Sequence, residues 1–597
     1  MKSPAKTGQA SNATETSYWR SIGEAAGTPE HADWTDREFP EGASELPEDF
    51  SRRDFLKLMG ASAGLAGAGM LGVGCRRPEE HIVPFGTEQA QGQDYVHGVP
   101  MYFATAMPTR TGAIPLVVES NEGRPTKVEG NPDHPDSNGA TDLFAQASIL
   151  NLYDPDRARQ YTKHGKPMSK ADTVEELKKL AADDKKTAFL MPAANSPSRE
   201  RLITEIKESR GENVRFYVHE AIDFGVHQRA ATAAFGQSVR PYWKLDQASV
   251  ILSLDCDFIG TEEESARYIR DFARGRKLAK NDDSMSRLYV MEALMSQTGA
   301  NADHRLRANA SSIATAAAFI ASELGITVDG DVGQLTADQK KWMAGCVKDL
   351  RAHNGKGLVV AGYRQPEAVH QLIHQINDVL ENNGKTVVFL PADDAVYGDL
   401  SDLKSDLGKI DRIINLGCNP SYDGAADLNW SDAAKKKTDF RLSDFEQDES
   451  HEKYGIVAPR AHYLESWGDA RTSDGTVVPI QPLIAPLFDA MSELEVLTIF
   501  AKWVGEPEAP QTAHEVVQKT FTGDSWEHYL HEGYQDGTAS KPVENLQLAN
   551  ETVKLEGKTL AEGELEVVFT RDHSVDDGRF ANNGWCQELP DPITKIT

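Results

Sequence analysis

Cysteine side chains are the first candidates for chemistry in this sequence, because thiolates bind zinc and iron–sulfur clusters. Such sites usually take at least two ligands from one tight loop, since closing a short loop costs little chain entropy. The five cysteines stand far apart, and no C-x-x-C pair occurs. We therefore expect no iron–sulfur cluster, structural zinc or disulfide framework in this chain. The cysteines are Cys75, Cys256, Cys346, Cys418 and Cys586.

Three loops that follow apolar runs are the next candidates, because ligands of parallel sheets bind at the carboxyl ends of strands. None matches G-x-G-x-x-G or a P-loop, so nicotinamide and ATP chemistry have no support. The Gly-Cys-Asn-Pro loop is either a tight turn or a cofactor clamp, and a turn is the commoner structure. The loops are Asp255–Gly260, Gly362–Pro366 and Gly417–Pro420.

Three further segments are dense in polar and aromatic residues: Leu464–Ala470, Gln481–Pro486 and Gln297–Arg307. Each either lines a cavity or has a structural role. We favour packing for Trp467 and an exposed polar helix start for 303–305, because neither has a partner residue at a defined spacing.

The elements that position these loops are short apolar strands alternating with amphipathic helices beyond residue 160. Buried β-branched runs separated by helices predict doubly wound parallel sheets with helices on both faces, an α/β fold. The predicted strands are 187–191, 214–218, 249–254, 287–291, 357–361, 386–390 and 412–416, and the predicted helices include 263–274, 311–324 and 366–382. A small β-rich region precedes them, with a hairpin turning at Asn121–Pro125 between 113–120 and 126–132.

The strongest targeting signal is Ser-Arg-Arg-Asp-Phe-Leu-Lys at 51–57, followed by the Gly/Ala-rich stretch 58–74. This order predicts export by the twin-arginine pathway through Arg52 and Arg53, and a buried helix after an exposed Arg pair is the alternative. Cys75 ends the stretch and is a candidate for lipidation, although the match to a lipobox is imperfect. Residues 1–50 form a long leader extension, which we expect to be disordered.

Composition narrows the classes of partner. The 597 residues suffice for about four domains on the usual length prior, and their formal charge of -29 makes nucleic acid an unsuitable partner. A mean hydropathy of -0.49 excludes a multi-span membrane protein.

The leader resembles that of the molybdopterin-oxidoreductase-like subunit of alternative complex III. The likeness rests on Tyr-Trp-Arg-Ser at 18–21, Arg-Glu-Phe-Pro-Glu-Gly-Ala-Ser-Glu-Leu at 37–46 and the phrase at 51–62. Two later phrases, Glu129–Pro135 and Leu152–Arg157, resemble the wider molybdopterin oxidoreductase superfamily. Asp303–Arg307, Leu464–Ala470 and Gln481–Pro486 resemble the narrower subunit family.

This resemblance implies a molybdopterin-oxidoreductase-like fold in a periplasmic, membrane-associated complex that oxidises quinol. The implied partners are an iron–sulfur ferredoxin-like half or subunit, a multihaem cytochrome c and integral quinol-binding subunits. Iron–sulfur clusters and c-type haem would belong to the complex. Superfamily enzymes carry cysteines where this chain has Thr109, Arg110 and Thr111, and again where it has Thr141–Phe144, so the resemblance implies no catalytic, cofactor-binding or metal residues here.

The last residues, 582–597, resemble a junction after which the family continues into a dinucleotide-binding-like domain and an iron–sulfur half. The chain is accordingly divided into the leader extension 1–50, the signal 51–75, a β-rich region 76–160 and α/β domains 161–597. The leading hypothesis is an exported scaffold without a cofactor. The alternatives are a catalytic molybdopterin oxidoreductase acting on an inorganic sulfur or nitrogen compound, and an exported binding protein without an electron-transfer role.

Overall fold

The computed structural model describes residues 98–596, except 281–283, 393–396, 436, 502–511, 550–551 and 562. It also describes positions 26, 28, 29 and 57. The chain divides into two units, residues 1–94 and 95–597, and the elements described here belong to the second. Arg52, Arg53 and Cys75 lie outside the described residues, so the predictions for export and lipidation stay predictions.

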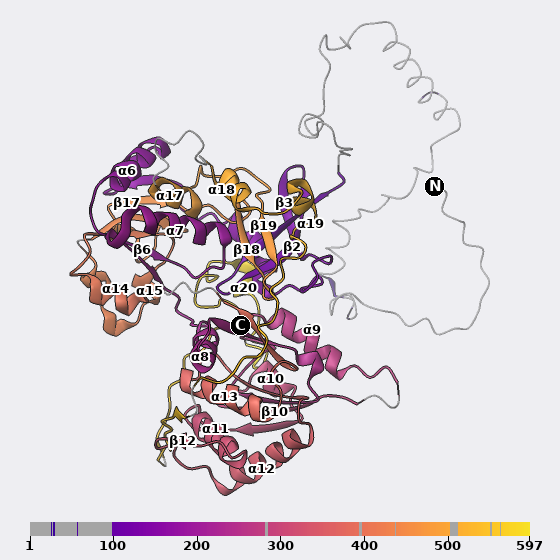
Figure 1. The fold of residues 1–597 in the computed structure, drawn as a ribbon. Coiled ribbons are helices and arrows are strands. Elements are labelled where there is room, and N and C mark those ends of the chain that lie inside the picture. The colour runs from indigo at the N-terminus through magenta and orange to yellow at the C-terminus, as the bar shows by residue number, and fades with distance from the viewer. Residues whose placement is uncertain are drawn as a thin grey trace, which may run out of the picture. The chain divides into compact units, whose positions relative to one another are not determined.

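An antiparallel sheet in the order β1-β2-β3 opens the second unit (Figure 1). Its strands are β1 (Met101–Pro108), β2 (Ala113–Asn121) and β3 (Arg124–Gly130). The predicted hairpin is confirmed: Asn121 pairs with Arg124, and both intervening residues have positive φ, as a type I′ turn requires. Helix α5 (Leu143–Leu152) packs on the buried face of this sheet.

A seven-stranded sheet follows in the order β5-β4-β17-β16-β15-β6-β7, parallel from β17 to β7. Both faces of β6 are buried, because Phe189 and Met191 pack with α6, α7 and α17 while Ala188 and Leu190 pack with α14 and α16. Helices thus cover both sides. The strands are β4 (Tyr161–Lys163), β5 (Lys166–Met168), β6 (Thr187–Met191), β7 (Val214–Val218), β15 (Arg412–Asn415), β16 (Thr438–Ser443) and β17 (Ile456–Pro459), and the helices are α6 (Lys170–Ala182), α7 (Pro197–Arg210), α14 (Leu400–Asp406), α16 (Trp430–Ala433) and α17 (Glu493–Phe500).

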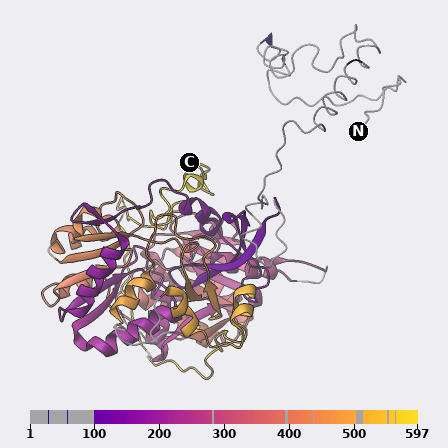
Figure 2. The same ribbon diagram turned by 90° about the horizontal axis from the view of Figure 1, so that it is seen from above.

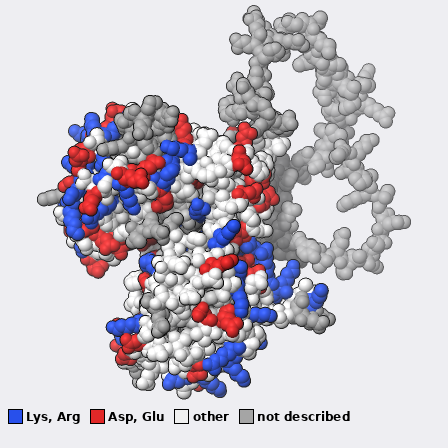
Figure 3. All heavy atoms as spheres, in the orientation of Figure 1, with Lys and Arg blue, Asp and Glu red and all other residues white. Residues whose placement is uncertain are grey.

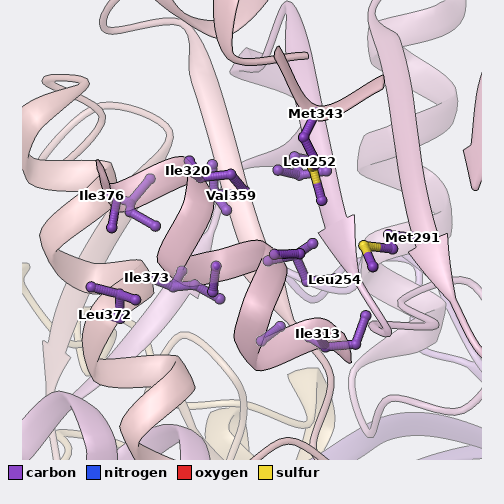
Figure 4. Packing of buried hydrophobic residues seen from close by; sticks show 14 of the residues in the cluster. Leu252, Leu254, Met291, Ile313, Ile320, Met343, Val359, Leu372, Ile373 and Ile376 are labelled. Atoms are coloured by element: carbon purple, nitrogen blue, oxygen red, sulfur yellow. The ribbon is translucent and has the colours of Figure 1, made fainter. Parts of the chain in front are cut away.

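A four-stranded parallel sheet has the order β11-β10-β9-β13. Leu252 and Leu254 of β9 point toward α11, α12 and α13 (Figure 4), whereas Ile251 packs on the opposite side with α8 and α9. This sheet too has helices on both faces (Figure 1 and Figure 2), so the predicted α/β class is confirmed. The strands are β9 (Val250–Leu254), β10 (Arg287–Glu292), β11 (His304–Arg307) and β13 (Gly357–Ala361), and the helices are α8 (Val226–Phe235), α9 (Ser265–Arg276), α11 (Ser312–Glu323), α12 (Ala337–Ala352) and α13 (Glu367–Val379).

Two sequence predictions are wrong in detail. The strand predicted at 386–390 is β14 (Val387–Pro391), which pairs antiparallel with β8 (Val239–Trp243), because a buried apolar run does not reveal the direction of its neighbour. Residues 303–305 do not start a helix. They lead into β11, an edge strand that tolerates polar residues because one side is free.

The remaining helices and strands are short, and four of the strands form two separate two-stranded sheets, β12-β20 and β18-β19. They are α10 (Gln297–Ala300), β12 (Val328–Asp329), α15 (Pro420–Asp423), β18 (Gly468–Arg471), β19 (Val477–Ile480), α18 (Ala513–Thr520), α19 (Trp526–Glu532), β20 (Val553–Lys554) and α20 (Gly584–Gln587). Within the described residues, no helix combines the length and apolar character that a membrane span requires.

Candidate functional site

The seven-stranded sheet has a cavity of about 780 Å³ at the carboxyl ends of its parallel strands, which we term the strand-end cavity. Part of its lining comes from residues within two positions after five strands, as expected for a ligand site of a parallel sheet. These residues are Pro192 after β6, His219 after β7, Gly417 after β15, Asp444 after β16 and Arg460 after β17.

A second cavity of about 860 Å³ lies at the start of helices α8 and α9, and we term it the α8/α9 cavity. Phe224 and Gly225 precede α8, and Glu262–Glu264 precede α9. Glu220, just beyond β7, lines both cavities, so the wall between them is built around this carboxylate.

That wall is an ion cluster of Arg110, Glu220, Glu263, Arg571, Asp576, Asp577 and Arg579, whose side chains are buried except for that of Arg579, which is 40% exposed. Arg110 is its centre, with Nε donating to Glu220 at 2.9 Å and Nη2 donating to Asp577 at 2.8 Å. Arg579 Nη2 donates to Asp577 at 2.7 Å, and Arg571 Nε donates to Asp576 at 2.8 Å. Residues 571–579, which we term the C-terminal segment, therefore close the space between the two cavities.

The charges of this cluster stabilise one another. Burial alone would raise the pKa of Asp577, but the neighbouring Arg579 and Arg110 hold it well below its usual value. Burial and Arg579 would lower the pKa of Arg110, yet Glu263, Asp576 and Glu220 outweigh them and raise it. Asp577 is therefore ionised at neutral pH, and both guanidinium groups that hold it have their donors directed at carboxylates.

The positions where the resemblance implies lost cysteines have structural roles here. Arg110 enters the ion cluster, while Thr109 Oγ1 accepts from Gly112 N at 3.2 Å and so closes the turn between β1 and β2. Asp142 caps α5 by accepting from Ala145 N at 2.7 Å. Phe144 packs against Phe580, with ring centroids 4.8 Å apart.

The Gly417–Pro420 loop lines the strand-end cavity as a tight turn. Asn415 holds it, since its Oδ1 accepts from Gly417 N at 3.0 Å and from Cys418 N at 2.8 Å. Gly417 has φ of 123° and lies so close to Arg460 that a Cβ would stand 2.7 Å from the guanidinium. The Cys418 thiol is buried, and this burial raises its pKa well above the usual value.

The other two predicted loops contact each other instead of enclosing a ligand. Asp255 accepts from Arg364 Nη2 at 2.7 Å and from Gln365 Nε2 at 2.9 Å. Gly362 lies directly against Asp255, because a Cβ on it would meet the Asp255 carbonyl oxygen at 2.0 Å. Of these loops, neither lines the strand-end cavity or the α8/α9 cavity.

The dense polar and aromatic segments are packing elements. Trp467 packs edge to face against His514, with ring centroids 4.6 Å apart, which agrees with the packing role expected from the sequence. Gln481 Nε2 donates to Leu530 O at 2.9 Å, and its backbone N donates to Thr105 at 3.1 Å. Asp303 binds Arg276, with 2.8 Å between Oδ2 and Nη1.

Both cavities are lined by more carboxylates than guanidinium groups. The α8/α9 cavity has eight Asp or Glu residues against four Arg, and the strand-end cavity has nine against four. The outer surface differs, because acidic and basic side chains are interspersed on the face shown in Figure 3. Among the described residues, no group of three or more His, Cys, Asp or Glu has a geometry that suits a metal ion.

Comparisons with known proteins assign no family. No family model matches the sequence. No curated protein sequence matches it. Among solved structures, a chain of the formyltransferase/hydrolase complex FhcABCD from Methylorubrum extorquens, in complex with methylofuran, aligns with a TM-score of 0.40 and 12% identity. The alignment covers 60% of this chain and 99% of that chain, and a likeness at this level carries no argument about function.

Proposed function

We propose that this chain is an exported scaffold subunit of a membrane complex that oxidises quinol, and that it holds no redox cofactor of its own. The sequence resemblance supports the complex, and the two parallel α/β sheets agree with the coarse class that the resemblance implies. The observation that carries the proposal is the buried ion cluster, because the chain's own C-terminal residues bind the charged groups between the two cavities.

A molybdopterin cofactor does not fit these residues. Its phosphates require backbone N–H groups or unpaired cationic side chains. The cavities instead present at least twice as many carboxylates as arginines, and Arg110, Arg441 and Arg579 are bound to carboxylates already. A phosphate placed there would meet net negative charge in a poorly solvated space, which is costly.

The cysteine beside the strand-end cavity is a poor molybdenum ligand. Cys418 is the one cysteine that lines a described cavity, and burial raises its pKa well above the usual value, which disfavours the thiolate that a metal ligand must provide. The catalytic alternative, a molybdopterin oxidoreductase acting on a sulfur or nitrogen compound, therefore has less support than the scaffold. In the proposed complex, iron–sulfur clusters belong to a ferredoxin-like partner and c-type haem to a multihaem cytochrome, at the periplasmic face of the membrane.

The test is the molybdenum, iron and pterin content of the exported chain, purified alone and with its bound partners from cells supplied with molybdate. We expect no molybdenum or pterin in either sample, and iron and haem only in the complex. Molybdenum and pterin near one per chain would make this a catalytic subunit. A chain that never co-purifies with haem or iron–sulfur subunits would instead be a binding protein.

A further inference from the structure

Residues 563–570, with the sequence Gly-Glu-Leu-Glu-Val-Val-Phe-Thr, form an exposed apolar segment on this chain. Leu565 is 94% exposed, Val567 79% and Phe569 86%, the three highest values among the exposed large apolar side chains of the described residues. They occupy alternate positions, which in an extended chain project from one side. The composition is that of a β-strand, rich in β-branched and aromatic residues.

The backbone of this segment is as unpartnered as its three exposed apolar side chains. Glu564 N donates to Ala561 O at 3.1 Å, and Arg571 N donates to the Tyr363 hydroxyl at 2.8 Å. Between these two residues, no backbone N–H or C=O group has a hydrogen-bond partner among the described residues. The segment therefore offers a free row of donors and acceptors beside an apolar row of side chains, which is the usual template for strand addition.

Both ends of the segment are anchored, so its position is defined before any partner binds. Upstream, β20 pairs parallel with β12. Downstream, Arg571 belongs to the buried ion cluster. In between, the Glu566 carboxylate accepts from Ser311 N at 3.1 Å, just before α11, which directs Glu566 toward the body of the chain and its neighbours outward. An anchored strand binds at lower entropic cost than a mobile one.

Exposure of this kind has a large cost if it is permanent. Burying a Leu, Val or Phe side chain stabilises a protein, and natural proteins block uncovered strand edges with charge or proline. The side that carries Leu565, Val567 and Phe569 has neither. We propose that 563–570 is a docking strand, which pairs with an extended segment of the iron–sulfur partner.

The charge of the chain selects the kind of partner. Two copies of a chain with a formal charge of -29 repel each other, which disfavours self-association through this strand. Glu564 and Glu566 contact groups of this chain, namely Ala561 N and Ser311 N, but they keep the segment negatively charged, which favours Lys or Arg on the opposing segment. The expected partner segment alternates apolar with basic residues. The identity of the partner rests on the proposed function, whereas the strand pairing does not.

The experiment compares the chain alone with the native complex isolated from membranes. We expect amide hydrogen exchange at 565–570 to slow at least tenfold in the complex. A benzophenone side chain at position 569 should cross-link to the iron–sulfur subunit. Cross-linking to a second copy or to residues 1–94 of the same chain would overturn the proposal.

Proline variants test the backbone pairing directly. Val567→Pro and Val568→Pro remove neighbouring N–H groups that face opposite sides of a strand, so at least one must weaken partner retention about tenfold while the free chain keeps its melting temperature. The control is Val379→Ser, a change at another exposed apolar residue. Serine replaces proline in this control because a proline at Val379 would break α13. If the complex assembles normally with both prolines and with fast exchange at 565–570, the docking strand is wrong. If wild-type chain binds no redox subunit, the proposed function fails instead.

Discussion

The Arg157 guanidinium forms two hydrogen bonds with the Glu465 carboxylate, from Nη1 to Oε1 at 3.0 Å and from Nη2 to Oε2 at 2.6 Å. The same carboxylate accepts from His462 N at 3.0 Å and from Leu487 N at 2.9 Å. Burial alone would raise the pKa of Glu465, but Arg157 outweighs it and the pKa is lowered. Two segments on which the family resemblance rests, 152–157 and 464–470, are thus joined by a buried ion pair.

We predict that Arg157→Met lowers the free energy of unfolding by about 3–5 kcal/mol, because it leaves a buried carboxylate without its cation. Urea denaturation of the purified chain measures this. The matched control is Arg229→Met, which breaks an ion pair whose two side chains are more than half exposed and should cost less than about 1 kcal/mol. Equal losses in the two variants would contradict the importance of the buried pair.

A second prediction concerns pH. Burial, followed by the neighbouring Arg157, lowers the pKa of His462 from 6.5 to about 3, although Glu465 opposes this shift. Between pH 6.5 and 3, His462 therefore binds a proton in the unfolded chain but not in the folded chain. The stability that neutral His462 contributes is complete above pH 6.5 and declines as the pH falls.

Leu464 N donates to His462 Nδ1 at 3.3 Å. His462→Asn removes this titration and keeps an acceptor for that N–H group. Its stability should depend less steeply on pH between 6 and 4, by up to about 1.4 kcal/mol per pH unit. Denaturation curves across that range measure the slope. The control variant is His528→Asn, which alters a histidine whose side chain is 59% exposed. A slope in His462→Asn equal to that of the wild type would refute the assignment.

The cysteines provide a third prediction. Cys256→Ser, Cys346→Ser and Cys418→Ser should each leave complex assembly and electron transfer intact, because these thiols are buried and ligate nothing in a scaffold. A buried hydroxyl costs stability, on the order of 1–3 kcal/mol if unpaired. The matching Cys→Ala series separates that cost from chemistry. Loss of quinol oxidation in an assembled variant would overturn the claim that the chain has no cofactor.

Export is the fourth prediction. Changing Arg52 and Arg53 together to Lys should leave the full-length chain in the cytoplasm, because the twin-arginine pathway reads the Arg pair and not its charge alone. Cell fractionation measures the distribution, with Lys57→Arg as a control that preserves the pair. Unchanged periplasmic recovery of the double variant would refute the export assignment.

The strands of the two parallel sheets were predictable because they are continuous apolar runs. Residues 187–191, 214–218 and 357–361 agree at both ends with β6, β7 and β13. Strand partners were not predictable, since β14 shows the same pattern although it pairs antiparallel. β11 was missed because its polar sequence, His-Arg-Leu-Arg, is tolerated only at an edge.

The candidate site was predicted only in part. The Gly417–Pro420 loop does line a cavity, because the rule for strand ends needs no knowledge of distant contacts. The ion cluster was not predicted, since Arg571, Asp576, Asp577 and Arg579 look like a solvated charge run in sequence. Only the structure shows that this segment makes ion pairs with Arg110 and Glu220, because no local spacing signals a contact between residues so far apart.

The ion cluster can form only after residues far apart in the sequence have both been synthesised. Arg110 and Asp577 are separated by 467 positions, which at ribosomal rates of about 5–20 residues per second corresponds to roughly 25–90 s. Throughout that interval Arg110 lacks the carboxylates of the C-terminal segment. The ion pairs of Arg110 are therefore complete only after Asp577 has been synthesised, and the export route proposed above, which accepts folded proteins, is compatible with that order.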